Sequence, residues 1–207
     1  MFNLQGVRAL GRQSLAGLRT LLLFTVVLGI AYPLVVWGIG QAAFGWRADG
    51  SLVTTTGAHT RSFADAAGSS LIGQDFKGNK WFLPRPSAAG TGYDPLDTYG
   101  SNYGPEDPRL VKLIKQRQAE ISAREHVAVS AIPPDAVTAS ASGLDPAISP
   151  AYAALQAARV AREHGLTLTS VQRLIKENTT GRALGFLGDP AVNVLMLNIA
   201  ITQAHGS

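Results

Sequence analysis

LLLFTVVLGIAYPLVVWGIG, residues 21–40, is the stretch that decides the architecture of this chain. It lies inside a longer uncharged run, residues 20–46, which stands between Arg19 and Arg47. A helix rises about 1.5 Å per residue, so roughly 27 uncharged positions span about 40 Å, more than the hydrocarbon thickness of a bilayer. The run therefore predicts one transmembrane helix over residues 20–44.

A cleaved signal peptide is the alternative for this run, because a small-x-small sequence, residues 40–42, follows it. The apolar regions of signal peptides are only about 7 to 15 residues long, so the length favours a membrane anchor. The arm before the run has no acidic residue and three arginines, Arg8, Arg12 and Arg19. Because basic flanks stay on the cytoplasmic side, we expect residues 1–19 in the cytoplasm and residues 47–207 outside the inner membrane.

Small residues within the span predict that it packs against other transmembrane helices. Gly38 and Ala42 form a small-xxx-small pair, which lets two helix backbones approach closely. Gly29 and Ala31 add further flat surface, and Pro33 is expected to bend the helix in the middle of the membrane. The helix is thus expected to be a packing surface as well as an anchor, in contact with lipid elsewhere.

The composition of the exported part excludes two function classes. The chain has 18 basic and 14 acidic residues, and three of the basic ones lie in the arm, which leaves 15 against 14 outside. A nearly neutral domain does not predict a nucleic-acid-binding face. The chain has no cysteine, so it contains neither disulfides nor thiolate metal sites.

Strand patterns come early in the exported part and helix patterns come late, which predicts an α+β domain after the transmembrane helix. The expected strands are residues 52–56, 70–76, 81–83 and 136–138. Four helices are expected. The first begins at residues 105–108 and ends near His126, and the second runs from Pro150 to His164. The third runs from Thr169 to about Asn178, and the fourth follows Asp189-Pro190 and continues to the end of the chain.

Motifs of common active sites are missing from the sequence. It has no phosphate-binding glycine loop, no zinc-protease motif and no nucleophile elbow. The four histidines, His59, His126, His164 and His205, are scattered without metal-ligand spacing. His126 and His164 fall where helices are expected to end, a position that favours a cation. We therefore expect no catalytic residues and no metal site.

Residues 84–108 form a long loop rich in Pro, Gly, Ser and Asp, with Tyr93, Tyr99 and Tyr103 spaced through it. Long loops in compact domains are usually functional or disordered, and tyrosine gives contact area with little rotamer entropy to lose. Partner contact is one interpretation of these tyrosines. A solvated connector whose tyrosines fold back on the core is the other.

The most unusual sequence of the exported part is residues 137–165, VTASASGLDPAISPAYAALQAARVAREHG. Small residues allow close backbone approach, and the segment predicts a tight turn followed by a helix that begins at Ser149-Pro150. Ser142, Gly143 and Asp145 in the turn are candidate partner contacts. The helix is expected to expose three polar side chains, Gln156, Arg159 and Arg162. A turn that merely joins two core elements is the alternative.

Several segments in order along the chain resemble the KdpC family, the small subunit of the bacterial Kdp potassium-transporting P-type ATPase. The strongest resemblance is SGLDPAISPAYAALQAARVA, residues 142–161. The others are Ala31-Tyr32-Pro33-Leu34 in the span, residues 68–74, residues 82–88, residues 100–102, residues 190–194 and Leu197-Asn198. The resemblance covers nearly the whole chain.

The resemblance implies a non-catalytic subunit of a high-affinity potassium uptake complex. Its implied partners are a channel-like potassium-translocating subunit, a P-type ATPase subunit and a small accessory subunit. ATP and potassium would be handled by the complex, with no cofactor tightly bound to this chain. The alternative is a single-span receptor or envelope domain with an extracellular ligand, although an arm of about 19 residues is too short for an output domain.

The family is also described as a catalytic chaperone that raises the ATP affinity of the P-type subunit. The resemblance assigns nucleotide contact to Gln156, with Arg159 and Arg162 as phosphate partners. The charge flanks contradict this assignment, because they put the helix outside the cell, where cytoplasmic ATP does not reach it. From the residues we therefore favour a role of residues 138–162 in folding or in gripping partner subunits.

Overall fold

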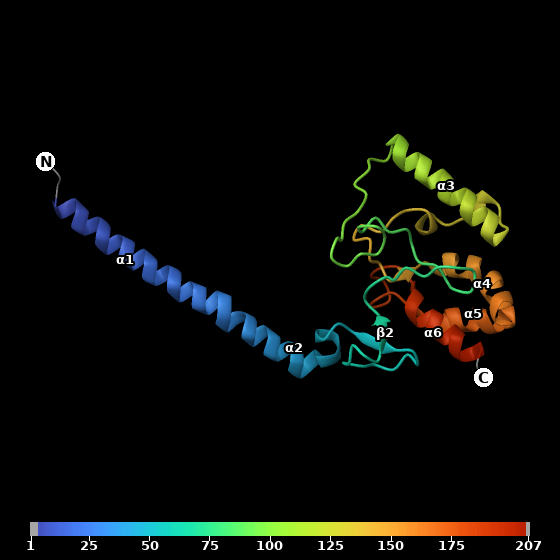
Figure 1. Ribbon diagram of the computed structural model, residues 1–207, viewed down its shortest axis with the longest axis horizontal. Coiled ribbons are helices and arrows are strands. Elements are labelled where there is room, and N and C mark those ends of the chain that lie inside the picture. The colour runs from blue at the N-terminus through green and yellow to red at the C-terminus, as the bar shows by residue number, and fades with distance from the viewer. Residues whose placement is uncertain (1–3, 206–207) are drawn as a thin grey trace. The chain divides into compact units, whose positions relative to one another are not determined.

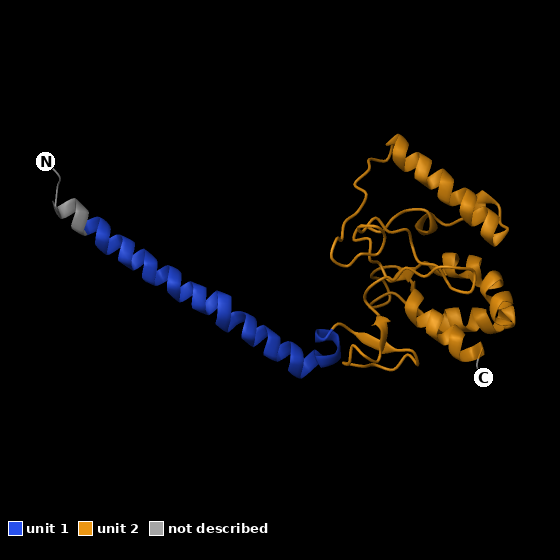
Figure 2. Ribbon diagram, in the orientation of Figure 1, with its two compact units in different colours: residues 1–49 blue, residues 50–207 orange. Residues whose placement is uncertain are grey.

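The structure, a computed structural model, describes residues 4–205 of the chain (Figure 1). The chain divides into two units, Met1–Asp49 and Gly50–Ser207, which Figure 2 colours separately. Residues 1–3, the beginning of the arm expected in the cytoplasm, lie outside the described residues.

The first unit is a long apolar helix with an irregular turn near its middle and a kink near its end. It consists of α1 (Leu4–Val26), a π-helical turn η1 (Val27–Ala31) and α2 (Tyr32–Ala48). Within the described residues one stretch, Ala9–Ala48, is long and apolar enough to cross a membrane, and none of its most apolar window is buried. The expected N-terminal apolar helix is confirmed, and it extends past both ends of residues 20–44. Phe44, where the span was expected to end, has a non-helical backbone (φ −137°, ψ 29°).

The π turn lies directly before Pro33. In this turn the Tyr32 N–H donates to the Val27 carbonyl oxygen, five residues back instead of four. Proline has no N–H, so the carbonyl one turn before it, at Leu28 or Gly29, receives no hydrogen bond from residue 33. A single π turn is a common way to accommodate such a break.

Two small antiparallel sheets lie in the second unit. β1 (Leu52–Thr54) pairs with β2 (Ala66–Ser69). In the other sheet β5 (Ala191–Asn193) lies between β3 (Ala147–Ile148) and β4 (Thr179–Thr180). All of these strands are short, so most of the core must come from helices.

The helices of this unit are α3 (Pro108–Glu125), α4 (Pro150–His164), α5 (Leu168–Glu177) and α6 (Val194–His205). Two single 3₁₀ turns, η2 (Val129–Ala131) and η3 (Pro134–Ala136), follow α3. Strands of the first sheet precede the helices, and the expected α+β class is confirmed. The core lies where α4, α5 and α6 meet the sheet around β5, with Val160, Val171 and Leu197 fully buried.

Helix ends set by local chemistry were predicted correctly. The Ser149 hydroxyl accepts from the Tyr152 N–H at 3.0 Å, Pro150 is the first residue of α4, and Gly165 ends the helix in the left-handed region. His164 is the last residue of α4, and His126 is the C-cap of α3.

Several expected elements were wrong. Residues 70–76 form no strand, because Gly73 bonds the Leu144 carbonyl and its bare Cα lies against the Asp145 backbone. Residues 81–83 pair with no strand, although Phe82 is buried. Residues 136–138 form no strand either, because Ala136 ends the 3₁₀ turn η3 and the next two residues continue as a turn. The cap of α5 is Thr167, not Thr169, and strand β5 precedes the last helix.

Candidate functional site

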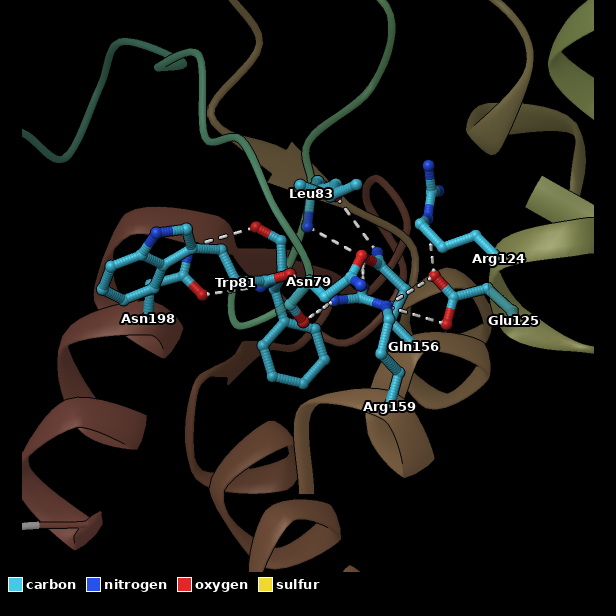
Figure 3. A network of polar contacts seen from close by, with 9 residues as sticks. Asn79, Trp81, Leu83, Arg124, Glu125, Gln156, Arg159 and Asn198 are labelled. Atoms are coloured by element: carbon cyan, nitrogen blue, oxygen red, sulfur yellow. Dashed lines mark hydrogen bonds and ion pairs between the residues drawn. The ribbon is translucent and has the colours of Figure 1, made fainter. Parts of the chain in front are cut away.

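Side chains from two helices hold residues 79–83, a segment that has no strand partner (Figure 3). Asn198 of α6 accepts from the Phe82 N–H at 2.8 Å and donates to the Phe82 carbonyl at 3.0 Å. Gln156 of α4 makes the same pair of bonds with Leu83, at 2.8 and 3.1 Å. Figure 3 places the two amides on opposite sides of the segment. Each amide thus forms with one residue the two backbone hydrogen bonds that a neighbouring strand would otherwise form.

Arg159 completes this arrangement. Its Nε donates to both carboxylate oxygens of Glu125, at 2.9 and 3.0 Å, and its Nη2 donates to the Gln156 Oε1 at 2.9 Å. Its Nη1 donates to the carbonyls of Asn79 and Trp81, the latter at 2.9 Å. Burial lowers the pKa of Arg159, and the Glu125 carboxylate opposes that shift. Arg159 is therefore a buried cation compensated by one carboxylate and fixed by backbone carbonyls.

His164, at the end of α4, also contacts residues 79–83. The His164 Nε2 lies 2.8 Å from the Lys80 carbonyl oxygen, and the His205 Nδ1 lies 2.7 Å from the His164 carbonyl oxygen. A carbonyl only accepts, so each of these ring nitrogens carries a proton and donates. His164 thus ties the end of α4 to the segment, and His205 ties the end of α6 to α4.

The expectation that α4 exposes Gln156 and Arg159 was wrong. Gln156 is fully buried and Arg159 is only 3 % exposed, whereas Arg162 is exposed. Positions 152, 156 and 159 lie on one helix face, and that face carries the buried Tyr152. The structure therefore separates the three residues assigned to nucleotide contact: two of them support residues 79–83, and one faces solvent.

The turn that was expected to contact partners is packed against the loop of residues 84–108. Gly143 is buried at φ +72°, and its carbonyl accepts from the Ser87 hydroxyl at 2.7 Å. Asp145 pairs with Arg85 at 2.9 Å. Ser142 is exposed, and its hydroxyl accepts from the Leu144 N–H. Of these three candidates, Ser142 has the most accessible side chain.

The three tyrosines of the loop have different environments. The Tyr93 hydroxyl donates to the Arg85 carbonyl, and burial raises the pKa of Tyr93 above its ordinary value. Tyr103 lies against the Arg109 guanidinium, 4.5 Å from the ring centroid. Tyr99 is about half exposed. Tyr93 is thus a structural residue, and Tyr99 is the most accessible of the three.

The residues proposed for membrane packing lie around the π turn and in α2. Gly29 and Ala31 belong to η1, and Pro33, Gly38 and Ala42 belong to α2. A Cβ added at Gly29 or Gly38 would meet no atom within 4 Å, apart from the helix's own backbone. Both glycines leave open surface on the helix.

Comparison with known proteins identifies the family to which this chain belongs. A family model described as "K+-transporting ATPase, c chain" matches residues 14–203. The chain belongs to the KdpC family. It is 49 % identical over 193 residues to the KdpC subunit of Kineococcus radiotolerans, covering 93 % of this chain and 94 % of the relative.

Other KdpC subunits give similar values. The subunit of Mycobacterium bovis strain BCG Pasteur is 47 % identical over 193 residues, which cover 93 % of this chain and 98 % of the relative. The subunit of Beijerinckia indica is 47 % identical over 182 residues, with 88 % and 89 % coverage. The resemblance to KdpC is confirmed, and the chain is a membrane-associated accessory subunit of the potassium-transporting ATPase rather than its catalytic chain.

Sequence reasoning missed two important residues of this KdpC domain. Glu125, whose side chain is fully buried, lies at the end of α3 and was not singled out by any pattern in the sequence. Asn198 was noted only as part of the family resemblance. A lone amide within the apolar sequence VLMLNIAI of α6 was the available signal, because a buried amide must find hydrogen-bond partners.

Proposed function

We propose that this chain is the single-span assembly subunit of a potassium uptake ATPase in the bacterial inner membrane. Its proposed neighbours are the channel-like potassium-translocating subunit, the P-type subunit and a small accessory subunit. In this proposal ATP and potassium bind to those neighbours, and residues 47–207 lie on the outer side. The observation that carries the proposal is an exposed apolar helix with a polar break at its centre.

The break supports a packing role because of where it lies. Tyr32 and Pro33 are at the middle of the uncharged run 20–46, about 15 Å from either edge of the hydrocarbon layer. Tyr32 is 62 % exposed, and its side chain ends in a hydroxyl group. In hydrocarbon, that hydroxyl and the carbonyl freed by Pro33 both need partners. A neighbouring transmembrane helix with a polar side chain supplies them.

The packing role predicts the effect of a larger residue on this helix. Gly38→Leu fills the surface that lets a partner backbone approach, so the yield of partner subunits that co-purify in detergent should fall several-fold. Phe24→Leu, at an exposed apolar position of α1, is the matched control and should keep the yield. If the double change Gly29→Leu and Gly38→Leu leaves assembly intact, the helix is only a tether.

The same purification separates the proposed subunit from a receptor. A subunit brings large polytopic partners with it, whereas a single-span receptor comes out without them. A reporter fused after Ser207 tests the orientation, because the proposal requires an export-dependent reporter to be active. A reporter active only in the cytoplasm would reverse the orientation.

We further propose that any effect of this subunit on ATP affinity passes through contacts between subunits. Both lone pairs of the Gln156 Oε1 accept hydrogen bonds inside the domain, and Arg159 donates to Glu125, Gln156 and the Asn79 and Trp81 carbonyls of the same domain. Arg162 alone of the three assigned residues has a free surface. Arg162→Ala should therefore leave the apparent KM for ATP of the assembled pump unchanged, and a large rise would support direct contact.

A further inference from the structure

A pocket of about 330 Å³ lies between α3, Tyr152 of α4 and the chain that follows residues 79–83. Its wall includes three arginines, Arg85, Arg117 and Arg124. Apolar side chains such as Leu83 and Ile121 form the rest of the wall. The pocket is separate from the Gln156 amide, and no role has yet been given to it.

Each arginine is fixed by one contact, which leaves donors unused. Arg85 pairs with Asp145 through Nη1, Arg117 donates from Nη1 to the Val137 carbonyl at 2.8 Å, and Arg124 donates from Nε to Glu125 at 2.9 Å. The Nε of Arg85 is buried and has no hydrogen-bond partner. A buried donor without an acceptor costs about 1–3 kcal/mol, so its presence at a pocket wall indicates an acceptor that enters the pocket.

Tyr152 provides a second, independent donor. Its side chain is only 2 % exposed, it lines the pocket, and its hydroxyl makes no hydrogen bond with any of the described residues. Burial is the main cause of the raised pKa of Tyr152, so the hydroxyl keeps its proton. Arg85 and Tyr152 thus both line one cavity, and each carries a donor that is bonded to no acceptor within the described residues.

The charge around the pocket selects the ligand. Two acidic residues, Asp75 and Glu120, also line it, but both are exposed and engaged, with Lys77 at 2.7 Å and Gln116 at 2.8 Å. Arg85 is paired with Asp145, Arg124 shares the Glu125 carboxylate with Arg159, and Arg117 forms no ion pair with a described residue. The guanidinium groups at the wall therefore outnumber the carboxylates paired with them, which favours a negatively charged ligand.

We propose that this pocket binds one carboxylate group. Its oxygens accept from the Arg85 Nε–H and the Tyr152 hydroxyl, with the arginine charges compensating it, and the apolar wall receives its aliphatic stem. The group is either a free monocarboxylic acid or an Asp or Glu side chain of a neighbouring subunit. The second source rests on the proposed function, and the first does not.

The test uses the full chain in detergent with ¹⁵N-labelled arginine and sodium acetate as the probe. Acetate should displace the Arg85 Nε–H resonance saturably, whereas sodium chloride at equal ionic strength should not. Tyr152→Phe keeps the ring in the core and should weaken acetate binding about tenfold or more, as expected for a hydrogen bond to a charged group. Tyr103→Phe, whose ring lies outside this pocket, is the matched control and should bind acetate normally.

An absent or non-saturable acetate effect, an equal chloride effect, or wild-type binding by Tyr152→Phe would overturn the proposal. Co-purification separates the two sources. Tyr152→Phe lowers the yield of partner subunits if a neighbour supplies the carboxylate, and leaves it unchanged if the ligand is a free acid. Failure of the wild-type chain to bring partners would sink the proposed function while leaving the acetate result standing.

Discussion

Gln156→Ala is the sharpest perturbation of this domain, because it removes three buried hydrogen bonds at once. It leaves the Leu83 N–H, the Leu83 carbonyl and one Arg159 N–H without their partner. At about 1–2 kcal/mol for each such group, the lower part of the range for an unsatisfied buried donor or acceptor, the expected loss in the free energy of unfolding is about 3–6 kcal/mol. Domains are stable by only about 5–15 kcal/mol, and the loss therefore removes a large part of the total.

Thermal unfolding of the full chain in detergent, followed by circular dichroism, measures this loss. For a domain of this size, about 3–6 kcal/mol corresponds to a fall in Tm of roughly 10–20 °C. Gln156→Met keeps most of the volume but none of the hydrogen bonds, so it should lose nearly as much. Arg162→Ala, on the exposed side of the same helix, should stay within about 0.5 kcal/mol of wild type.

The reasoning is refuted if Gln156→Ala is as stable as Arg162→Ala. The pump gives a second readout. Molecules with Gln156→Ala that still assemble should keep the wild-type dependence on ATP, since the amide is engaged with Leu83 and Arg159. A large rise in the apparent KM for ATP with assembly intact would instead support direct contact between Gln156 and the nucleotide.

Gly143→Ala should destabilise the domain by about 1–3 kcal/mol in denaturant unfolding, because its Cβ would lie 2.6 Å from the Ala89 Cβ at a left-handed backbone position. Gly78→Ala, with φ +90° but open space, should lose only the backbone part, and equal losses would contradict the steric argument. Burial raises the pKa of Tyr93 above its ordinary value of 10.0, so its stabilisation is complete below about pH 10 and is lost as pH rises through the folded pKa. Alkaline unfolding followed by phenolate absorbance should therefore be less steep in Tyr93→Phe, and an unchanged pH profile would show that this hydroxyl is not the group responsible.

Local chemistry explains which parts of the fold the sequence could predict. An uncharged run between two arginines identifies the span without any knowledge of tertiary contacts. Ser149, Pro150 and Gly165 determine the ends of α4 through backbone preferences of their own. Pro33 predicted an irregular helix, although only the structure shows that the irregularity is a π turn.

Long-range polar contacts explain what could not be predicted. Residues 81–83 have the composition of a strand, but their partners are side chains 73 and 116 positions further along the chain. Gln156 and Arg159 were placed on the surface because polar residues on a helix usually face water. Hydrophobic periodicity cannot detect a polar residue on the buried face of a helix. The contacts of Gln156 and Arg159 with residues 79–83 could therefore not be predicted from the sequence pattern. The membrane-packing surface and the nucleotide assignment remain predictions.

The two amides that hold residues 79–83 also have a consequence for solubility. A strand at the border of a sheet leaves a row of unpaired N–H and C=O groups, to which a strand of another molecule can add. Here Asn198 occupies the groups of Phe82 on one side, and Gln156 occupies those of Leu83 on the other (Figure 3). A segment with strand-like composition is thereby closed to intermolecular pairing on both of its edges, so loss of either amide would open a site for aggregation.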